Sequence, residues 1–347
     1  MSSPIRIGMA GCGRIVLGVH LPALARCNGV TVTALAEPDE RNRERAQRLV
    51  PNAKAFRGVE EMLSSAALDA VAICLPNALH AEACVAAFAR GLHVYLEKPL
   101  AASLYEGRAI LDAWRMAGSV GMIGFNYRFN PLYESARRSV QSGRLGEIVA
   151  LRSIFSLPVH EIPAWKNGAA AGGGVLFDLA SHHVDLAHHF SGSEVTSVLA
   201  RPAVEDGRWE SAVLEMRLAS GAIVQSFFSL AAVEDDRIEI YGRAGKLAVD
   251  RHRSLTTELR GATHRSARAD RLRHLARSAA RVPYLLEKRR SPAFEPSYPA
   301  AWRAFAAAVR ERKPASPDLE DGYRSLEVIQ AAMESAVSGG WIEVTGR

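Results

Sequence analysis

The sequence has 347 residues, of which 48% are hydrophobic and 23% charged, and its formal net charge is +6. This length exceeds that of a domain with one hydrophobic core, so we expect two domains. The composition is typical of a globular protein and excludes a disordered or a fibrous one. No run of about 18 apolar residues is present, so the sequence predicts no membrane-spanning helix.

The N-terminal residues MSSPIRIGMAGCG enter a strand by Ile5 and lack the successive regions of a secretory signal. The four cysteines, Cys12, Cys27, Cys74 and Cys84, form no C-x-x-C pair. This pattern predicts reduced thiols with neither a metal nor a redox role. We therefore expect a cytoplasmic protein.

The first predicted elements are a strand, a glycine turn and a helix. The strand spans 5–10, the turn contains Gly11 and Gly13, and the helical pattern continues to Leu24. Gly13 would let the backbone approach a pyrophosphate at the start of the helix. Because Val16 stands where a third small residue is usual, a strand-helix turn without a ligand remains the alternative.

A second buried strand, 30–36, ends at Glu37. An acidic side chain at this point accepts hydrogen bonds from the adenine ribose and repels a 2′-phosphate, which favours NAD over NADP. Arg41 and Arg43 keep NADP as an alternative, because they would attract such a phosphate. An exposed loop carboxylate is the other interpretation of Glu37.

Alternating helices and strands complete a parallel β-α-β domain. Helices are predicted over 39–49, from about 77 to 89 and over 104–117, and strands over 53–56, 69–75, 93–96 and 120–125. The ligand crevice of such a sheet lies at the carboxyl ends of its strands. We therefore expect Asn77 and His80 at the crevice, although a surface position at a helix start is the alternative for His80.

The strand at 93–96 stops at Glu97-Lys98-Pro99, which places an ionic pair at the same crevice. Pro99 narrows the backbone choices of Lys98 and permits a cis bond between them. A surface salt bridge closing the strand is the alternative interpretation of the pair.

After Phe125 the pattern changes, and the strands predicted between 196 and 241 follow one another without helices between them, which predicts an α+β domain with a mostly antiparallel sheet. Helices are expected over 131–142, 175–190, 300–311 and 320–338, and strands over 148–156, 196–203, 211–218, 223–230, 237–241 and 341–344.

One helix of this second domain carries a carboxylate and an imidazole on one face. Asp178 and His182 are four residues apart, and Asp185 and His189 continue the stripe. A histidine titrates near neutrality and so suits the removal of a hydroxyl proton. The cluster HHVDLAHH also allows a metal site, but no C-x-x-C or H-E-x-x-H motif accompanies it, so we expect no metal.

These motifs together resemble the glucose-fructose oxidoreductase, inositol dehydrogenase and rhizopine-catabolism (Gfo/Idh/MocA) family of NAD(P)-dependent oxidoreductases. The resemblance depends on AGCGRI, LPNALHAEACVAAFARGLHVYLEKPLA, NYRFNPLY, GGGVLFDLASHHVD and DLEDGYRSLEVIQAAMESAVSG, in this order. It implies a Rossmann domain, expected over 1–124, and a substrate-binding α/β domain over 125–347, whose open sheet packs against another subunit in a homodimer or homotetramer.

The resemblance also implies a catalytic set of Lys98, Asp178 and His182. The expected function is hydride transfer between a nicotinamide and a secondary hydroxyl or ketone of a sugar, sugar derivative or cyclitol. The alternative is a non-catalytic NAD(P)-binding regulator or scaffold. Weaker candidates for the substrate wall are Arg128, Trp165 and Lys166. The expected cofactor-binding residues are Gly11, Gly13, Arg14, Ile15, Glu37, Leu75, Pro76, Asn77, His80, Glu97 and Lys98.

A basic segment, 251–292, departs from this pattern: its residues 251–290 contain 12 Lys or Arg and three acidic residues, a net charge of +9. Leu272, Leu275, Ala279 and Val282 form an apolar stripe within it. The segment would contact an anionic membrane surface, hold a phosphorylated or nucleotide-linked sugar, or serve as a solvated insertion, the interpretation that we favour. Nucleic acid is not expected, because no recognition motif is present.

Overall fold

The structure is a computed structural model that describes residues 3–158, 174–205, 208–261 and 282–344. It divides into two compact units, 1–129 with 290–326, and 130–289 with 327–347. Each is described separately below. In the described part of the chain, no helix is long and apolar enough to cross a membrane.

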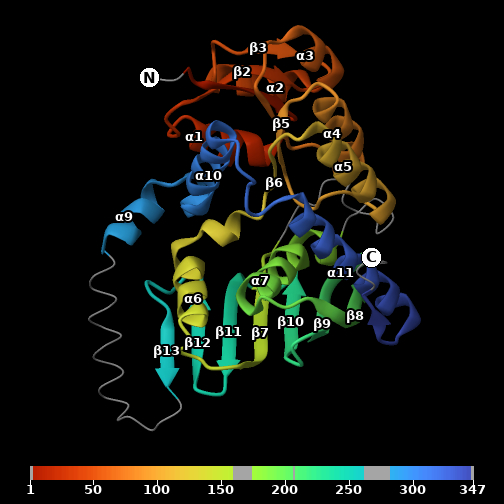
Figure 1. Cartoon of the computed structure of the whole chain (residues 1–347), viewed down its shortest axis with the longest axis vertical. Coiled ribbons are helices and arrows are strands. Elements are labelled where there is room, and N and C mark those ends of the chain that lie inside the picture. Colours follow the sequence, from red (N-terminus) through yellow and green to blue (C-terminus); the bar gives the residue numbers. More distant parts are fainter. Residues whose placement is uncertain (1–2, 159–173, 206–207, 262–281, 345–347) are drawn as a thin grey trace. The chain divides into compact units, whose positions relative to one another are not determined.

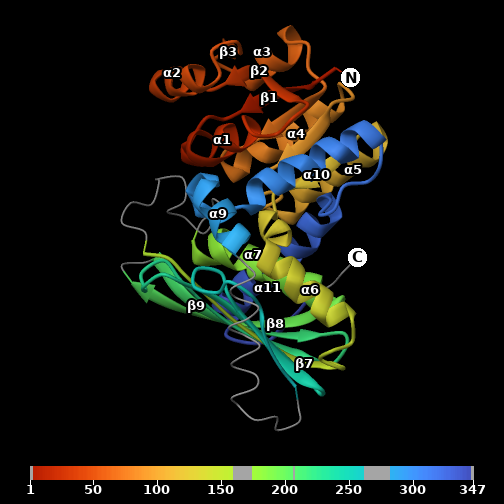
Figure 2. The same cartoon turned by 90° about the vertical axis from the view of Figure 1, so that its left-hand side faces the viewer.

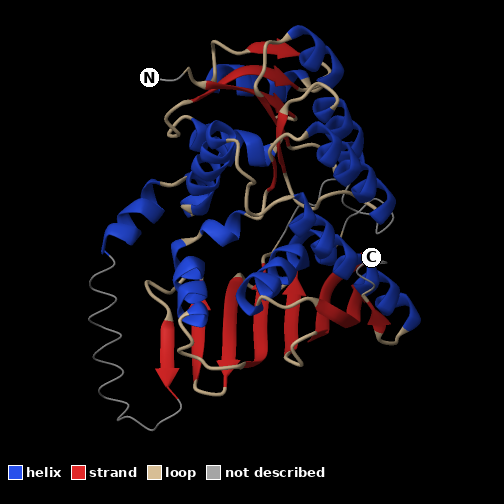
Figure 3. Ribbon diagram, in the orientation of Figure 1, coloured by secondary structure: helices blue, strands red, loops and turns tan. Residues whose placement is uncertain are grey.

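The first unit contains a parallel six-stranded sheet in the order β3-β2-β1-β4-β5-β6, shown with its helices in Figures 1 and 3. This is the doubly wound order of a Rossmann domain, in which the order of the strands reverses between β1 and β4. The strands are β1 (Ile5–Ala10), β2 (Val30–Ala36), β3 (Lys54–Phe56), β4 (Ala70–Ile73), β5 (His93–Leu96) and β6 (Gly121–Ile123).

Local sequence explains where one helix of the first unit begins and ends. In α5 (Leu104–Ala117), the Ser103 hydroxyl accepts the Glu106 N–H and Gly118 closes the helix at a positive φ of 62°. The other helices are η1 (Val16–His20), α1 (Leu21–Leu24), α2 (Glu40–Leu49), α3 (Val59–Ser65), η2 (Asn77–Leu79), α4 (His80–Phe88), η3 (Asn126–Phe129), η7 (Pro292–Phe294), α10 (Ser297–Glu311) and the first part of α11 (Leu319–Ser338).

The core of the first unit includes a segment from late in the chain. Trp302 and Phe305 of α10 are fully buried in one cluster with β1, η1 and α1. The aromatic packing explains why 290–326 belongs to this unit, whereas the predicted division placed these residues with the second domain. The assignment of cofactor binding to 1–124 and substrate binding to 125–347 stays a prediction.

The second unit contains an eight-stranded sheet in the order β13-β12-β11-β7-β10-β9-β8-β14, in which only β7 and β10 pair in parallel. The strands are β7 (Ile148–Ser156), β8 (Val195–Glu205), β9 (Arg208–Leu218), β10 (Ile223–Ser229), β11 (Asp235–Gly242), β12 (Gly245–Asp250), β13 (Glu258–Gly261) and β14 (Ile342–Glu343). The predicted α/β fold with a mostly antiparallel second sheet is confirmed.

Helices α6 (Pro131–Gln141) and α7 (Ser181–Ser191) pack on one face of this sheet, as Figure 2 shows. Buried and exposed residues alternate along β10, as expected for a sheet with one covered face. A π-helical turn, η6 (Leu176–Ala180), leads directly into α7, and α9 (Val282–Arg290) lies mainly in this unit. The predicted helix over 175–190 is therefore present, but its first part is wider than an α-helix.

Candidate functional site

The predicted cofactor-binding residues lie at the carboxyl ends of β1, β2, β4 and β5. Gly11, Gly13, Arg14 and Ile15 follow β1, Glu37 follows β2, the segment 75–80 follows β4, and Glu97 and Lys98 follow β5. In a parallel sheet of this order, ligands bind at the carboxyl ends of the strands, where the strand order reverses. The fold of the first unit thus brings these residues to one edge.

The glycine turn has the geometry that a dinucleotide requires. Gly11 has a positive φ of 86°, and a Cβ there would lie 2.4 Å from the Cys74 carbonyl oxygen, so only glycine fits. A Cβ at Gly13 would meet no described atom within 4 Å, so one side of this backbone is open to a ligand. The helix begins directly afterwards, and its N-terminal N–H groups favour a phosphate.

Glu37 is held rigidly beside this turn. Its Oε2 accepts the Cys12 N–H at 2.7 Å, and its Oε1 accepts the Asp39 N–H at 2.9 Å. Arg43 Nη1 donates to the carbonyl oxygens of Glu37 and Pro38, at 2.8 and 3.1 Å. These hydrogen bonds fix the Glu37 carboxylate at the end of β2, where a Rossmann sheet binds the adenine ribose of a dinucleotide.

His80 ties the loop after β4 to the loop after β5. Its Nε2 lies 2.9 Å from the Leu75 carbonyl oxygen, and its Nδ1 lies 3.0 Å from that of Pro99. Burial lowers the pKa of His80, and the facing carbonyl groups offset only part of this effect. The ring is fully buried, so His80 does not lie on the surface.

Glu97 and Lys98 lie at the tip of β5, and their predicted arrangement is found in part. The Lys98-Pro99 bond is cis. Glu97 Oε2 accepts the backbone N–H of Lys98 at 3.2 Å, while Glu97 Oε1 lies 3.0 Å from His20 Nε2. The buried His20 thus contacts Glu97, and the buried Trp302 in turn donates to His20. Sequence reasoning missed both residues because they lie far from Glu97 along the chain.

In the second unit, Asp178 lies in the π-helical turn η6 and His182 lies in the first turn of α7. A π-helical turn inside a helix is frequent at functional sites. His182 is 7% exposed, and its ring centroid lies 6.3 Å from that of Phe155 on β7. The same phenyl ring stacks on His183 at 5.3 Å, so the histidine pair is packed against the sheet.

Of the weaker candidates for the substrate wall, only Arg128 is described. Arg128 Nη1 donates to Asp321 Oδ2 at 3.0 Å, and both side chains are largely buried. Its substrate role stays a prediction. Trp165 and Lys166 lie outside the described residues, as do Leu272, Leu275 and Ala279 of the basic segment. The side chain of Val282 is likewise not described.

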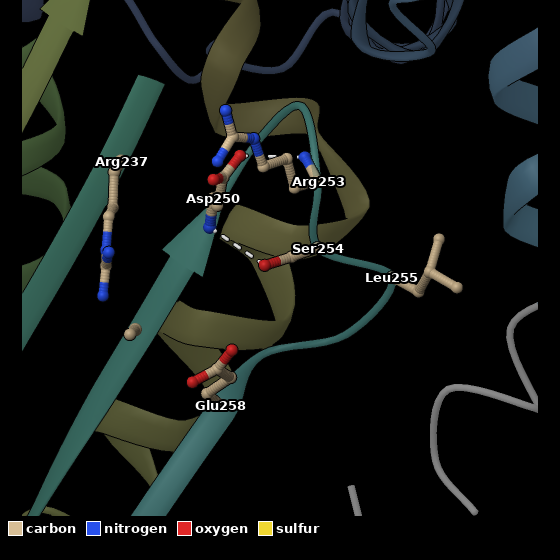
Figure 4. Close-up of a pocket in the computed structure, with 7 residues that line it drawn as sticks. Arg237, Asp250, Arg253, Ser254, Leu255 and Glu258 are labelled. Carbon is tan, nitrogen blue, oxygen red and sulfur yellow. Dashed lines mark hydrogen bonds between the residues drawn. The ribbon is translucent and has the colours of Figure 1, made fainter. Parts of the chain in front are cut away.

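A cavity of about 390 Å³ lies elsewhere in the second unit, beside β11 and β12 (Figure 4). Asp250 organises its wall, because Asp250 Oδ1 accepts the N–H groups of His252 and Arg253, and the Asp250 N–H donates to Ser254 Oγ. Among the described residues, no predicted site residue lines this cavity. Its lining residues are Arg237, Ala248, Asp250, Arg253, Ser254, Leu255 and Glu258.

Two family models match the chain. Residues 5–125 match an oxidoreductase family with an NAD-binding Rossmann fold, and residues 133–248 match the GFO/IDH/MocA C-terminal domain. The chain is 31% identical over 346 residues to a D-xylose 1-dehydrogenase (NADP(+)) of Haloferax volcanii, covering 97% of this chain and 99% of the relative. It is 27% identical over 341 residues to a myo-inositol 2-dehydrogenase of Thermotoga maritima, covering 95% and 96%.

Solved structures share the fold. The WlbA dehydrogenase of Bordetella pertussis, in complex with NADH and UDP-GlcNAcA, matches with a TM-score of 0.84 at 21% identity, over 99% of both chains. A levoglucosan dehydrogenase, in complex with NADH and levoglucosan, matches with a TM-score of 0.86 at 23% identity, over 99% of this chain and 100% of the other. The chain belongs to the Gfo/Idh/MocA family of NAD(P)-dependent oxidoreductases.

Proposed function

We propose that this protein oxidises a secondary hydroxyl of a sugar, sugar derivative or cyclitol with NAD, or reduces the matching ketone. The observation that carries the proposal is the edge of the first sheet, where the open side of Gly13 and the fixed carboxylate of Glu37 suit the two ends of an adenosine diphosphate. Relatives named as inositol and xylose dehydrogenases support the substrate class. They favour catalysis over a regulatory or scaffold role.

Lys98, Asp178 and His182 are the proposed catalytic residues. His182 takes the hydroxyl proton as general base, and the ammonium of Lys98 stabilises the negative charge that develops on the oxygen. Asp178 accepts a hydrogen bond from a neighbouring substrate hydroxyl. When bound, the nicotinamide accepts the hydride that leaves the same carbon, so the alcohol loses one proton and one hydride and becomes a ketone.

The binding half of this proposal is tested by thermal shift with NAD and NADP, since a ligand of the native state raises the midpoint of unfolding. Turnover is then followed by nicotinamide absorbance with myo-inositol, D-xylose, levoglucosan and a UDP-linked sugar acid. We expect stabilisation by NAD and reduction of NAD by at least one substrate. NAD binding without turnover across a broad polyol and sugar panel would favour the regulatory alternative.

The catalytic assignment is tested with Lys98→Ala and His182→Asn. We expect each to lower kcat by about 100-fold or more while NADH still binds, because general base and charge stabilisation each supply effects of this size. Lys313→Ala and His188→Asn are the matched controls, one an exposed lysine and the other a histidine on the same helix as His182. Full turnover in either catalytic variant would overturn the assignment.

We also propose a cytoplasmic homo-oligomer. All four cysteines are free, and three of them are buried, as is usual in a reducing compartment. The sheet of the second unit exposes Ile223 and Val213 on the face opposite α6 and α7. Light scattering during gel filtration would show a dimer or tetramer, and Ile223→Lys would dissociate it. A monomeric wild type would contradict this part.

A further inference from the structure

Two buried rings and a largely buried carboxylate of the first unit form a continuous hydrogen-bond chain that ends at the backbone of Lys98. Trp302 Nε1 donates to His20 Nδ1 at 3.2 Å, His20 Nε2 lies 3.0 Å from Glu97 Oε1, and the Lys98 N–H donates to Glu97 Oε2 at 3.2 Å. We call these contacts the Trp302–Lys98 chain. His20 and Trp302 are both fully buried.

The tautomer of His20 follows from this geometry. An indole Nε1–H donates and cannot accept, so His20 Nδ1 must offer its lone pair to Trp302. The proton of the neutral imidazole is then on Nε2, where it points at the Glu97 carboxylate. Trp302 thus determines which nitrogen of His20 is the donor, and both carboxylate oxygens of Glu97 accept a fixed N–H.

The neighbouring residues also restrict the position of the Glu97 carboxylate. A Cβ at Gly124 would lie 2.9 Å from Glu97 Oε1, so glycine leaves room for the carboxylate beside β6. Tyr95 stacks on Trp302 with centroids 4.3 Å apart, and His20 makes T-shaped ring contacts with both Tyr95 and Tyr298. These aromatic contacts restrict the orientations of the His20 and Trp302 rings, and so fix the directions of their hydrogen bonds.

We propose that His20 and Trp302 are positioning residues for Lys98: Trp302 selects the tautomer of His20, and His20 orients Glu97, which holds the peptide at Lys98. The inference rests on the proposed function, in which the Lys98 ammonium stabilises charge on the substrate oxygen. A displaced backbone moves that ammonium, and a misplacement near 1 Å has a large effect on rate. Neither residue touches substrate in this proposal.

The alternative is that His20 and Trp302 only fill the core, and variants chosen by chemistry separate the two roles. His20→Gln retains an amide that can accept from Trp302 and donate to Glu97, whereas His20→Phe retains the aromatic volume and loses both hydrogen bonds. Trp302→Phe retains an aromatic ring but loses the indole donor and part of the buried volume. Phe305→Leu is the control, because Phe305 packs edge-on against Tyr95 and Trp302 in the same core.

Turnover rates are divided by the concentration of NADH-binding sites, so that unfolded protein does not lower the measured kcat. We expect His20→Phe to lower kcat about 10- to 100-fold with little change in KM, because the loss concerns a group that acts in the transition state. Trp302→Phe should lose less, and His20→Gln should stay within about threefold of the wild type. Equal turnover in His20→Phe and Phe305→Leu would overturn the proposal.

A readout without turnover keeps this result separate from the proposed function. Labelling of glutamate carbonyl carbons and lysine amide nitrogens selects only Glu-Lys peptides, of which the sequence has two, at Lys98 and Lys288. Lys288→Arg identifies the second signal. We expect His20→Phe and Trp302→Phe, but not Phe305→Leu, to shift the Lys98 amide resonance, and the ring nitrogens of His20 to show the proton on Nε2.

An unmoved Lys98 amide in His20→Phe, or a proton on Nδ1 of His20, would refute the positioning role whether or not a substrate has been found. A shifted amide in a protein that turns over no sugar or cyclitol would instead contradict the proposed function and leave the hydrogen-bond chain established.

Discussion

Arg251 Nε donates a 2.6 Å hydrogen bond to Oδ2 of Asp236, a carboxylate with no exposed surface. Tyr133 Oη donates to the other oxygen, Oδ1, at 2.8 Å, and His183 Nε2 lies 3.3 Å from it. The contacts join α6, α7, the first residues of β11 and the residue after β12 within the second unit. His183 directly follows His182, so this buried carboxylate supports the helix that carries the proposed general base.

Asp236→Asn should destabilise the protein by about 3 kcal/mol, because it leaves the largely buried guanidinium of Arg251 without its counter-charge. Urea unfolding followed by circular dichroism measures this free energy. Asp235→Asn, one residue earlier and half-buried, is the matched control and should change it by less than about 0.5 kcal/mol. Equal stability of the two variants would show that the Asp236–Arg251 ion pair makes no net contribution to the free energy of unfolding.

The lowered pKa of Asp236 leads us to expect that the folding stability of the protein falls in acid. Burial raises the pKa of Asp236, but Arg251 and His183 lower it by more, so it lies well below its ordinary value of 3.8. Asp236 therefore binds a proton more readily in the unfolded chain than in the folded one. Its contribution to folding stability is present above about pH 4 and is lost as the pH falls further. Urea midpoints measured between pH 6 and pH 3 should fall less steeply in Asp236→Asn than in the wild type.

Glu37→Gln should weaken NADH binding about tenfold and reduce the preference for NADH over NADPH. The amide retains an oxygen for the Cys12 or Asp39 N–H but loses the charge that repels a 2′-phosphate. Fluorescence titration of both cofactors measures the two affinities. Glu44→Gln, on the exposed side of α2, is the control. An unchanged ratio of the two dissociation constants would contradict the ribose contact.

The four thiols should be unreactive in the native protein. Burial raises the pKa of Cys12 to about 12, with the Glu37 carboxylate adding to the effect, and burial also raises the pKa of Cys27, Cys74 and Cys84. Because the thiolate is the reactive form, iodoacetamide at pH 7.5 should modify none of them within the time that labels the urea-unfolded chain fully. Mass spectrometry counts the adducts. Rapid native labelling would contradict this prediction.

Much of the fold could be predicted from short stretches of sequence. The apolar strands ending at Ala10, Ala36 and Leu96 and the pattern of α5 depend on local periodicity and capping, and they were found where expected. Helix α3 and strands β12 and β13 were not predicted. In α3 only Met62 and Leu63 are buried, so its apolar signal is weak, and β12 and β13 are short strands defined by their pairing with β11 and with each other.

For the candidate site, sequence alone placed the glycine turn, Glu37 and Lys98 at the carboxyl ends of parallel strands, because the parallel direction of the strands follows from the alternation of β and α segments. Only the tertiary structure showed that Glu97 is oriented by His20, 77 residues away, and that His20 is in turn oriented by Trp302 of α10. Hydrophobic periodicity is a local property of the chain. The tautomer of a buried imidazole depends on which distant donors and acceptors packing brings to its two nitrogens, and no local pattern records that choice.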